Sequence, residues 1–343
     1  MSVKPRPGAG YVVGVDLGGT NVRAAVVDKN EKIVGQARNP SDAKMGAARV
    51  IEQTALTVRQ AVFEAGLKPE DIGAAGMAVP GHIDTREGLI RWSPNFGETV
   101  DGQFRMFLDV PFRGPVSDAM GIASYAGNDA NVAALGEFRY GAGRHVQDMV
   151  MYTLGTGIGS GVISSGMLVI GSTGGAAEIG HHVIVAGGDV CSCGVRGHLE
   201  AYCQRDAILR RAANHESLRA TLGLPTTEGV ASMSEDEKRD LPRRLSELAA
   251  GGSADAKAVW KETGYYLGIG IANVINIFNP TVVVIGGGIR RAEGLMEAAE
   301  ESMRRHAIES LARTCRIVEA ALGEDAGVMG AAELAWRMVA SES

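Results

Sequence analysis

Two segments of the chain repeat one local pattern, and this repeat constrains the fold more than any other feature. Residues 11–28 read YVVGVDLGGTNVRAAVVD, and residues 150–166 read VMYTLGTGIGSGVISSG. In each segment a glycine turn joins two short apolar, β-branched runs, which predicts a hairpin of two strands. Aligning Leu17 with Leu154 superimposes the two segments at an offset of 137 residues, which is too long for a solenoid repeat. The sequence therefore predicts a duplicated α/β unit.

The remaining apolar patterns fill in the two units. The expected helices are 43–65, 129–138, 264–278 and 327–339, and the expected strands are 72–79 and 281–285. Asn279 and Pro280 should end the third helix, and the last helix could return to the first unit. The predicted domains are therefore 1–125 together with 327–343, and 126–326. The polar segment 213–256 is expected to form a surface excursion of helices and loops without a recognisable motif.

Composition and charge exclude several classes of protein. Glycine accounts for 47 of 343 residues, about twice the average share of roughly 7%, which indicates many tight turns and close backbone approaches. The formal net charge of −6 gives no general attraction for nucleic acid or for a membrane surface. Glycines, asparagines and a proline interrupt the two long uncharged runs, so neither is expected to span a membrane. Because the N-terminus lacks the pattern of a signal peptide, we expect a cytoplasmic protein.

Both glycine turns are candidate phosphate sites. Without a Cβ, glycine lets several backbone N–H groups point at one anion. Neither turn is GxxxxGK[ST], and Gly155-x-Gly157-x-Gly159 is followed by strand residues instead of the helix of a dinucleotide-binding fold. One such turn alone could be a simple tight hairpin. Two turns at matched positions, with Asp16 beside the first, favour a nucleotide site in which Mg²⁺ bridges Asp16 and the phosphates, through water.

These segments resemble the ROK family of sugar kinases and repressors, which has the actin-like (ribonuclease H-like) ATPase fold. The matching segments are DLGGTNVR (16–23), GNDANVAALGE (127–137), TLGTGIGSG (153–161), EIGH (178–181), CSCGVRGHLE (191–200) and VVVIGGGI (282–289). Their order and separation cover nearly the whole chain. The resemblance implies two α/β domains with a cleft between them.

The resemblance also implies roles for single residues. Asp129 matches the general base, a task that suits a carboxylate because the phosphoryl-transfer transition state is loose and positioning matters most. The nucleotide and phosphate set is Asp16, Gly18, Gly19, Thr20, Asn21, Arg23, Gly155, Thr156, Gly157, Gly287 and Gly288. The sugar set is Asn95, Asn128, Asp129, Glu178, His181 and Glu200. Two of these have simpler explanations, since Asp129 could cap a helix and Asn95 could be a turn residue after Pro94.

Three of the four cysteines lie between residues 191 and 203, a spacing that favours a metal or redox cluster over disulfides. The family pattern is a histidine followed by CxCGxxGCxE, in which one histidine and three cysteines bind zinc. Here His198 replaces the last cysteine, and two imidazoles with two thiolates are an established tetrahedral zinc set. The expected ligands of this knuckle (181–198) are His181, Cys191, Cys193 and His198. Cys203 and His182 are the alternatives.

The expected activity is ATP-dependent phosphorylation of a hexose at the 6-hydroxyl, with Mg²⁺ and a structural Zn²⁺. Glucose is the first candidate. The family often has a tryptophan shortly after the asparagine at 95, and NFGETVDGQF has none. Fructose, allose, N-acetylmannosamine and N-acetylglucosamine, and polyphosphate as donor, therefore stay open. A sugar-sensing ROK regulator is the rival function, but only ten residues precede the first strand, too few for its DNA-binding domain. The family also suggests a homodimer.

Overall fold

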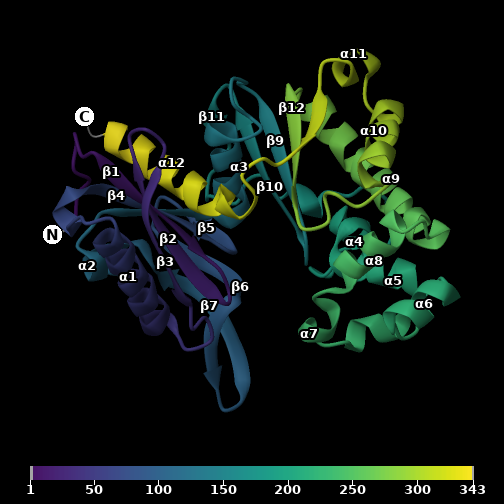
Figure 1. The fold of residues 1–343 in the computed structure, drawn as a ribbon, viewed down its shortest axis with the longest axis horizontal. Coiled ribbons are helices and arrows are strands. Elements are labelled where there is room, and N and C mark those ends of the chain that lie inside the picture. Colours follow the sequence, from purple (N-terminus) through teal and green to yellow (C-terminus); the bar gives the residue numbers. More distant parts are fainter. Residues whose placement is uncertain (1–2, 342–343) are drawn as a thin grey trace.

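The computed structural model describes residues 3–341, in which the first five-stranded sheet occupies the purple and blue half of the molecule (Figure 1). In the spatial order β3-β2-β1-β4-β8 its strands are Ile33–Pro40, Asn21–Asp28, Tyr11–Leu17, Ile72–Val79 and Ser124–Asn128. Strands β1 and β2 form the predicted antiparallel hairpin, with Leu17 opposite Val22. Strands β4 and β8 extend the sheet in parallel. The expected strand 72–79 is confirmed.

The second sheet repeats this arrangement. In the order β11-β10-β9-β12-β13 its strands are Met167–Leu168, Ile158–Ser164, Met149–Leu154, Val282–Gly287 and Arg316–Glu319. Strands β9 and β10 form the second antiparallel hairpin, and β12 and β13 follow in parallel, as β4 and β8 do in the first sheet. The predicted duplication of one α/β unit is therefore confirmed.

Two helices connect the sheets. Helix α12 (Ala326–Ser341) packs on β1 and β4 and against α3 (Asp129–Tyr140), which also packs on β10 of the second sheet. Figure 1 shows α12, in yellow, along the purple strands of the first half. Glycines allow this contact: a Cβ at Gly14 would lie 1.9 Å from the carbonyl oxygen of Val328, and one at Gly330 would lie 1.8 Å from that of Val132. The last helix therefore returns to the sheet where the chain began.

The other helices surround the two sheets. In the first half these are η1 (Pro69–Asp71), α1 (Ala47–Glu64) and α2 (Arg113–Met120), and α1 and α2 pack on strands of the first sheet. In the second half they are η2 (Ile179–His181), α4 (Glu200–Cys203), α5 (Arg205–Ala213), α6 (Glu216–Leu222), η3 (Glu228–Ser232), α7 (Glu235–Lys238), α8 (Leu241–Ala250), α9 (Ala254–Phe278), α10 (Leu295–His306) and α11 (Glu309–Ala312), with η4 (Gly323–Asp325) before α12. Helices α4, α5, α6 and α8 pack on α9. Among residues 3–341, no helix combines the length and apolar character that crossing a bilayer requires.

Helix α9 begins ten residues before the expected start at Gly264. Ser253 caps it by accepting a hydrogen bond from the backbone N–H of Ala256, and its end at Asn279 agrees with the prediction. Its first turns carry charged residues, among them Lys257, which pairs with Glu293, and Glu262, which pairs with Arg211. Because the prediction followed the uncharged run, it missed these turns.

A three-stranded sheet, β5-β6-β7, was not predicted. Its strands are His82–Asp84, Leu89–Val100 and Gln103–Pro111. Asp101 and Gly102 form the turn between β6 and β7, both with positive φ, and the hairpin projects from the first half (Figure 1). An Asp-Gly pair between two strands is a strong hairpin signal that the sequence analysis did not use.

Candidate active site

The first hairpin places Asp16 at the end of β1, beside the start of α12. A Cβ at Gly327 would lie 2.8 Å from the carboxyl carbon of Asp16, so the carboxyl group contacts the first turn of the helix. Burial, followed by repulsion from Asp129, raises the pKa of Asp16 to about 6, and Arg23 and Arg38 oppose this rise. The two carboxylates therefore face one region of the protein.

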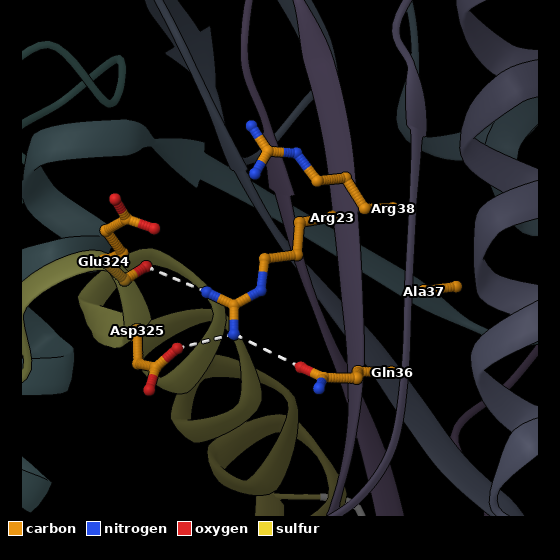
Figure 2. A pocket seen from close by; sticks show the side chains of 6 residues that line it. All are labelled: Arg23, Gln36, Ala37, Arg38, Glu324 and Asp325. Atoms are coloured by element: carbon orange, nitrogen blue, oxygen red, sulfur yellow. Dashed lines mark hydrogen bonds and ion pairs between the residues drawn. The ribbon is translucent and has the colours of Figure 1, made fainter.

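Arg23 and Arg38 follow Asp16 in a row across the first sheet, because Asp16 pairs with Arg23 and Arg23 with Arg38. Figure 2 shows both arginines lining a cavity of about 540 Å³. The guanidinium of Arg23 contacts the carboxylate of Asp325 at 2.6 Å, and it donates to the carbonyl oxygen of Glu324 at 3.2 Å. Arg23, which the resemblance assigns to phosphate binding, is thus held at the start of α12.

Asp129 is the first residue of α3, and its neighbour performs the capping. The side-chain oxygen of Asn128 accepts a hydrogen bond from the backbone N–H of Asn131 (3.1 Å), and its amide nitrogen donates to the carbonyl oxygen of Gly81 (3.0 Å). The carboxylate of Asp129 accepts a hydrogen bond from the adjacent N–H of Ala130 (2.9 Å). Burial raises the pKa of Asp129, and the hydrogen bonds from Ala130 and Asn128 oppose the rise. A carboxylate in such surroundings is suited to accept a proton.

The second glycine turn is fixed by a buried carboxylate. Glu200, the first residue of α4, accepts a hydrogen bond from the backbone N–H of Ile158 at 2.9 Å. A Cβ at Gly157 would lie 2.7 Å from the same carboxylate oxygen, so the close approach requires glycine. The other oxygen of Glu200 accepts from the hydroxyl of Ser192 at 2.6 Å. Glu200, expected to contact the sugar, therefore also connects the turn to the segment with the cysteines.

A cavity of about 360 Å³ opens beside this turn. Its walls are Leu154, Gly155, Thr156, Arg205, Glu235, Arg239, Pro242, Arg243, Gly288 and Ile289. Three of these belong to the expected nucleotide set, and Gly287 packs behind them, where a Cβ would lie 2.0 Å from the carbonyl oxygen of Leu154. The residues from α5, α7 and α8 were not predicted. No short motif marks these residues. Most of them belong to the segment 213–256, which only the folding of the chain brings to the cavity.

Three of the expected sugar residues, Asp129, His181 and Glu200, lie near a fourth, Glu178. Part of the Glu178 side chain is exposed, but burial of the rest raises the pKa of its carboxyl group. The nearby carboxylates of Asp129 and Glu200 also raise it. His181 opposes this effect. On the other side, a Cβ at Gly19 would lie 3.4 Å from the Cβ of Asn95, so Asn95 lies against the first glycine turn.

The four expected metal ligands come together. The ligand atoms of His181, Cys191, Cys193 and His198 all lie within 4.8 Å of one another. The sulfur of Cys191 is 3.6 Å from Nδ1 of His181, and the sulfur of Cys193 is 3.2 Å from Nδ1 of His198. Two thiolates and two imidazoles at such distances match the donors of a tetrahedral zinc site.

The two alternative ligands point elsewhere. The sulfur of Cys203 is buried against α9, 3.5 Å from the carbonyl oxygen of Thr263, and burial raises the pKa of this thiol to about 12. Nδ1 of His182 contacts the carbonyl oxygen of Ile179, and burial lowers the pKa of its imidazole.

A protein family, its relatives and solved structures match this chain over nearly its whole length. The model of the ROK family matches residues 12–338. A glucokinase from Thermotoga maritima is 34% identical over 330 residues, which are 94% of this chain and 96% of the relative. The crystal structure of a ROK hexokinase from Thermus thermophilus is 32% identical, covers 96% of this chain and 99% of its own, and has a TM-score of 0.78. A ROK glucokinase from Streptomyces griseus, in complex with glucose and AMPPNP, is 30% identical, with coverage of 96% and 100% and a TM-score of 0.74.

Proposed function

Since the chain belongs to the ROK family, we propose that this sugar kinase transfers the γ-phosphoryl group of ATP to the 6-hydroxyl of glucose. One observation supports the proposal most. Asp16 and Asp129 lie near enough for their charges to repel, in a protein with two matching hairpins that each carry a glycine turn. The pair of acids supplies one base and one partner for Mg²⁺, and the turns supply backbone N–H groups for phosphate.

Asp129 would accept the proton of the sugar hydroxyl as the phosphoryl group transfers. Its place at the start of α3 is fixed by the Asn128 cap, so the carboxylate needs no rearrangement to stay within reach of a bound hydroxyl. Mg²⁺ would neutralise the developing charge of the phosphates, with Asp16 as its partner through water. Gly18, Gly19, Thr20 and Asn21 would cradle the phosphates on one side, and Gly155, Thr156 and Gly157 on the other.

The sugar would be held by Asn95, Asn128, Glu178, His181 and Glu200. Buried polar groups discriminate strongly between sugars, because a sugar without the matching hydroxyl leaves them unpaired. The relatives named glucokinase favour glucose over other hexoses and N-acetylhexosamines.

We propose that the four-residue cluster holds one structural Zn²⁺. The ion would fix the segment that runs from η2 to α4, with Glu178 and His181 at one end and Glu200 at the other. The hydrogen bond from Ser192 to Glu200 supports this role, because it ties the knuckle to the carboxylate that also contacts the second glycine turn.

The division into domains 1–125 with 327–343, and 126–326, is likewise a proposal, and β8 would move its first boundary to residue 128. A homodimer is a further proposal from the resemblance alone, and a cytoplasmic location is one from the sequence; light scattering and cell fractionation test them.

A panel of sugars in a coupled assay of ADP release tests the function. We expect glucose to give the highest kcat/KM with ATP and Mg²⁺. A preference for another sugar would correct the substrate, and turnover with polyphosphate alone would correct the donor. Tight sugar binding without any turnover would favour the regulator.

A further inference from the structure

Arg205 lies directly beside the second glycine turn, although no sequence motif marks it. Its backbone N–H donates to the carbonyl oxygen of Gly155 at 2.9 Å, and its Nη1 is 3.5 Å from the hydroxyl of Thr156. The residue is 9% exposed and lines the 360 Å³ cavity. Arg205 therefore contacts both residues at the tip of the turn, once through its backbone and once through its side chain.

The guanidinium of Arg205 is held from the opposite side by a group of alternating charges. Its Nη2 donates to both carboxylate oxygens of Glu235, at 2.8 and 2.9 Å, and its Nε donates to Asp206 at 3.2 Å. Lys238, only 3% exposed, donates to the second oxygen of Asp206 at 2.8 Å. Glu235 and Lys238 are the first and last residues of α7, so the group joins this helix to the start of α5.

Stability alone does not explain this arrangement. Burial deprives the charges of Arg205 and Lys238 of hydration, and replacing a buried ion pair by apolar side chains is often neutral or stabilising. A planar guanidinium with three fixed partners has, however, a defined position and orientation. Here that orientation directs Nη1 at the hydroxyl of Thr156.

We propose that Arg205 is a positioning residue for the nucleotide, which holds Gly155 and Thr156 in the conformation that binds phosphate. Helix α7, which belongs to the polar segment 213–256, keeps Arg205 in place through Glu235. This inference rests on the proposed function, because only then does the turn bind the phosphates of ATP.

Arg205→Ala tests the proposal. Loss of the contact with Thr156 frees the turn, and the carboxylate of Glu235 loses its ion pair, while Asp206 keeps Lys238 as its partner. Losing a hydrogen bond that involves a charged group should weaken ATP binding by about 10- to 100-fold. The KM for glucose at saturating ATP should stay within about twofold, and adenosine, which has no phosphate, should lose less than about threefold in affinity.

Arg211→Ala is the matched control. Arg211 lies on the same helix, and its side chain is 10% exposed, as is the side chain of Arg205. It forms an ion pair with Glu262 at 2.8 Å and a hydrogen bond with Thr263 at 2.7 Å. It does not line the cavity. We expect this variant to lose stability and to keep its affinity for ATP. Arg205→Lys keeps the charge without the planar fork, and we expect ATP binding about 3- to 10-fold weaker than in the wild type.

Isothermal titration calorimetry with ATP and with adenosine, on the full chain, gives these affinities without turnover. The proposal is overturned if Arg205→Ala and Arg211→Ala weaken ATP equally, or if Arg205→Ala weakens adenosine as much as ATP. If Arg205→Ala does not fold, unchanged ATP binding by Arg205→Lys overturns it. A wild type that binds ATP but phosphorylates no sugar would refute the proposed function and not this inference.

Discussion

Replacing Asp16 by asparagine should make the protein inactive and, at neutral pH, more stable. The carboxyl of Asp16 is half-buried between Asp129 and the first turn of α12, where a Cβ at Gly327 would lie 2.8 Å away. These surroundings disfavour its charged form, which the proposed reaction needs for Mg²⁺. Asparagine keeps the shape of the side chain without the charge.

The expected gain follows from the pKa of Asp16. A rise from the ordinary value of 3.8 to about 6 corresponds to about 3 kcal/mol at full ionisation. Because solvent reaches part of the side chain, we expect a gain of about 1–2 kcal/mol. The destabilisation is absent below pH 3.8, where both folded and unfolded forms are protonated, grows between 3.8 and about 6, and is complete above that. The difference between variant and wild type should therefore shrink as the pH falls toward 4.

Urea unfolding without nucleotide or Mg²⁺, at about pH 7.5 and about pH 4.5, measures this difference. Asp28→Asn is the control on the same hairpin, because backbone hydrogen bonds from Lys32 and Asn30 lower the pKa of Asp28. That variant should lose stability at neutral pH. An Asp16→Asn protein that is less stable than the wild type at about pH 7.5, or whose gain does not change with pH, would refute the reasoning.

Three other predictions concern the metal cluster, the cleft and the contact at Gly327. Plasma mass spectrometry should find about one zinc per chain in the wild type and in Cys203→Ala, and little in His198→Ala; the opposite pattern would assign the fourth ligand to Cys203. Saturating glucose should close the two halves and lower the radius of gyration in small-angle scattering, whereas an unchanged profile would contradict closure. Gly327→Ala places a methyl group against Asp16, and steady-state kinetics should show kcat at least about tenfold lower; full activity would show that the contact can relax.

The parts of the fold that sequence predicts are those fixed by local patterns. Glycine turns between β-branched runs specify both hairpins, because only a tight turn fits between strands so close in the chain. The predicted start of α9 was wrong because the prediction followed the uncharged run, and the first turns of the helix contain charged residues. The hairpin of β6 and β7 was missed although its Asp101-Gly102 turn is a local signal.

The candidate site divides in the same way. The crowding of the cysteines predicted a metal or redox cluster, and the family resemblance supplied its four ligands. The structure brings the ligand atoms of His181, Cys191, Cys193 and His198 together. The residues from α7 and α8 that line the 360 Å³ cavity are more than 70 residues from the second glycine turn. Their place depends on how the excursion packs on α5 and α9, which no local pattern records.

Transfer of phosphate to glucose, with Asp129 as the base, is tested most directly by following the product. Wild type and Asp129→Asn would be incubated with ATP, Mg²⁺ and glucose, and the product identified by ³¹P NMR. We predict glucose 6-phosphate from the wild type, kcat lower by about 10²–10⁴ in the variant, and an ATP Kd within about threefold of the wild type. A variant that turns over within about threefold of the wild type, or a wild type that forms no glucose 6-phosphate, would contradict this mechanism.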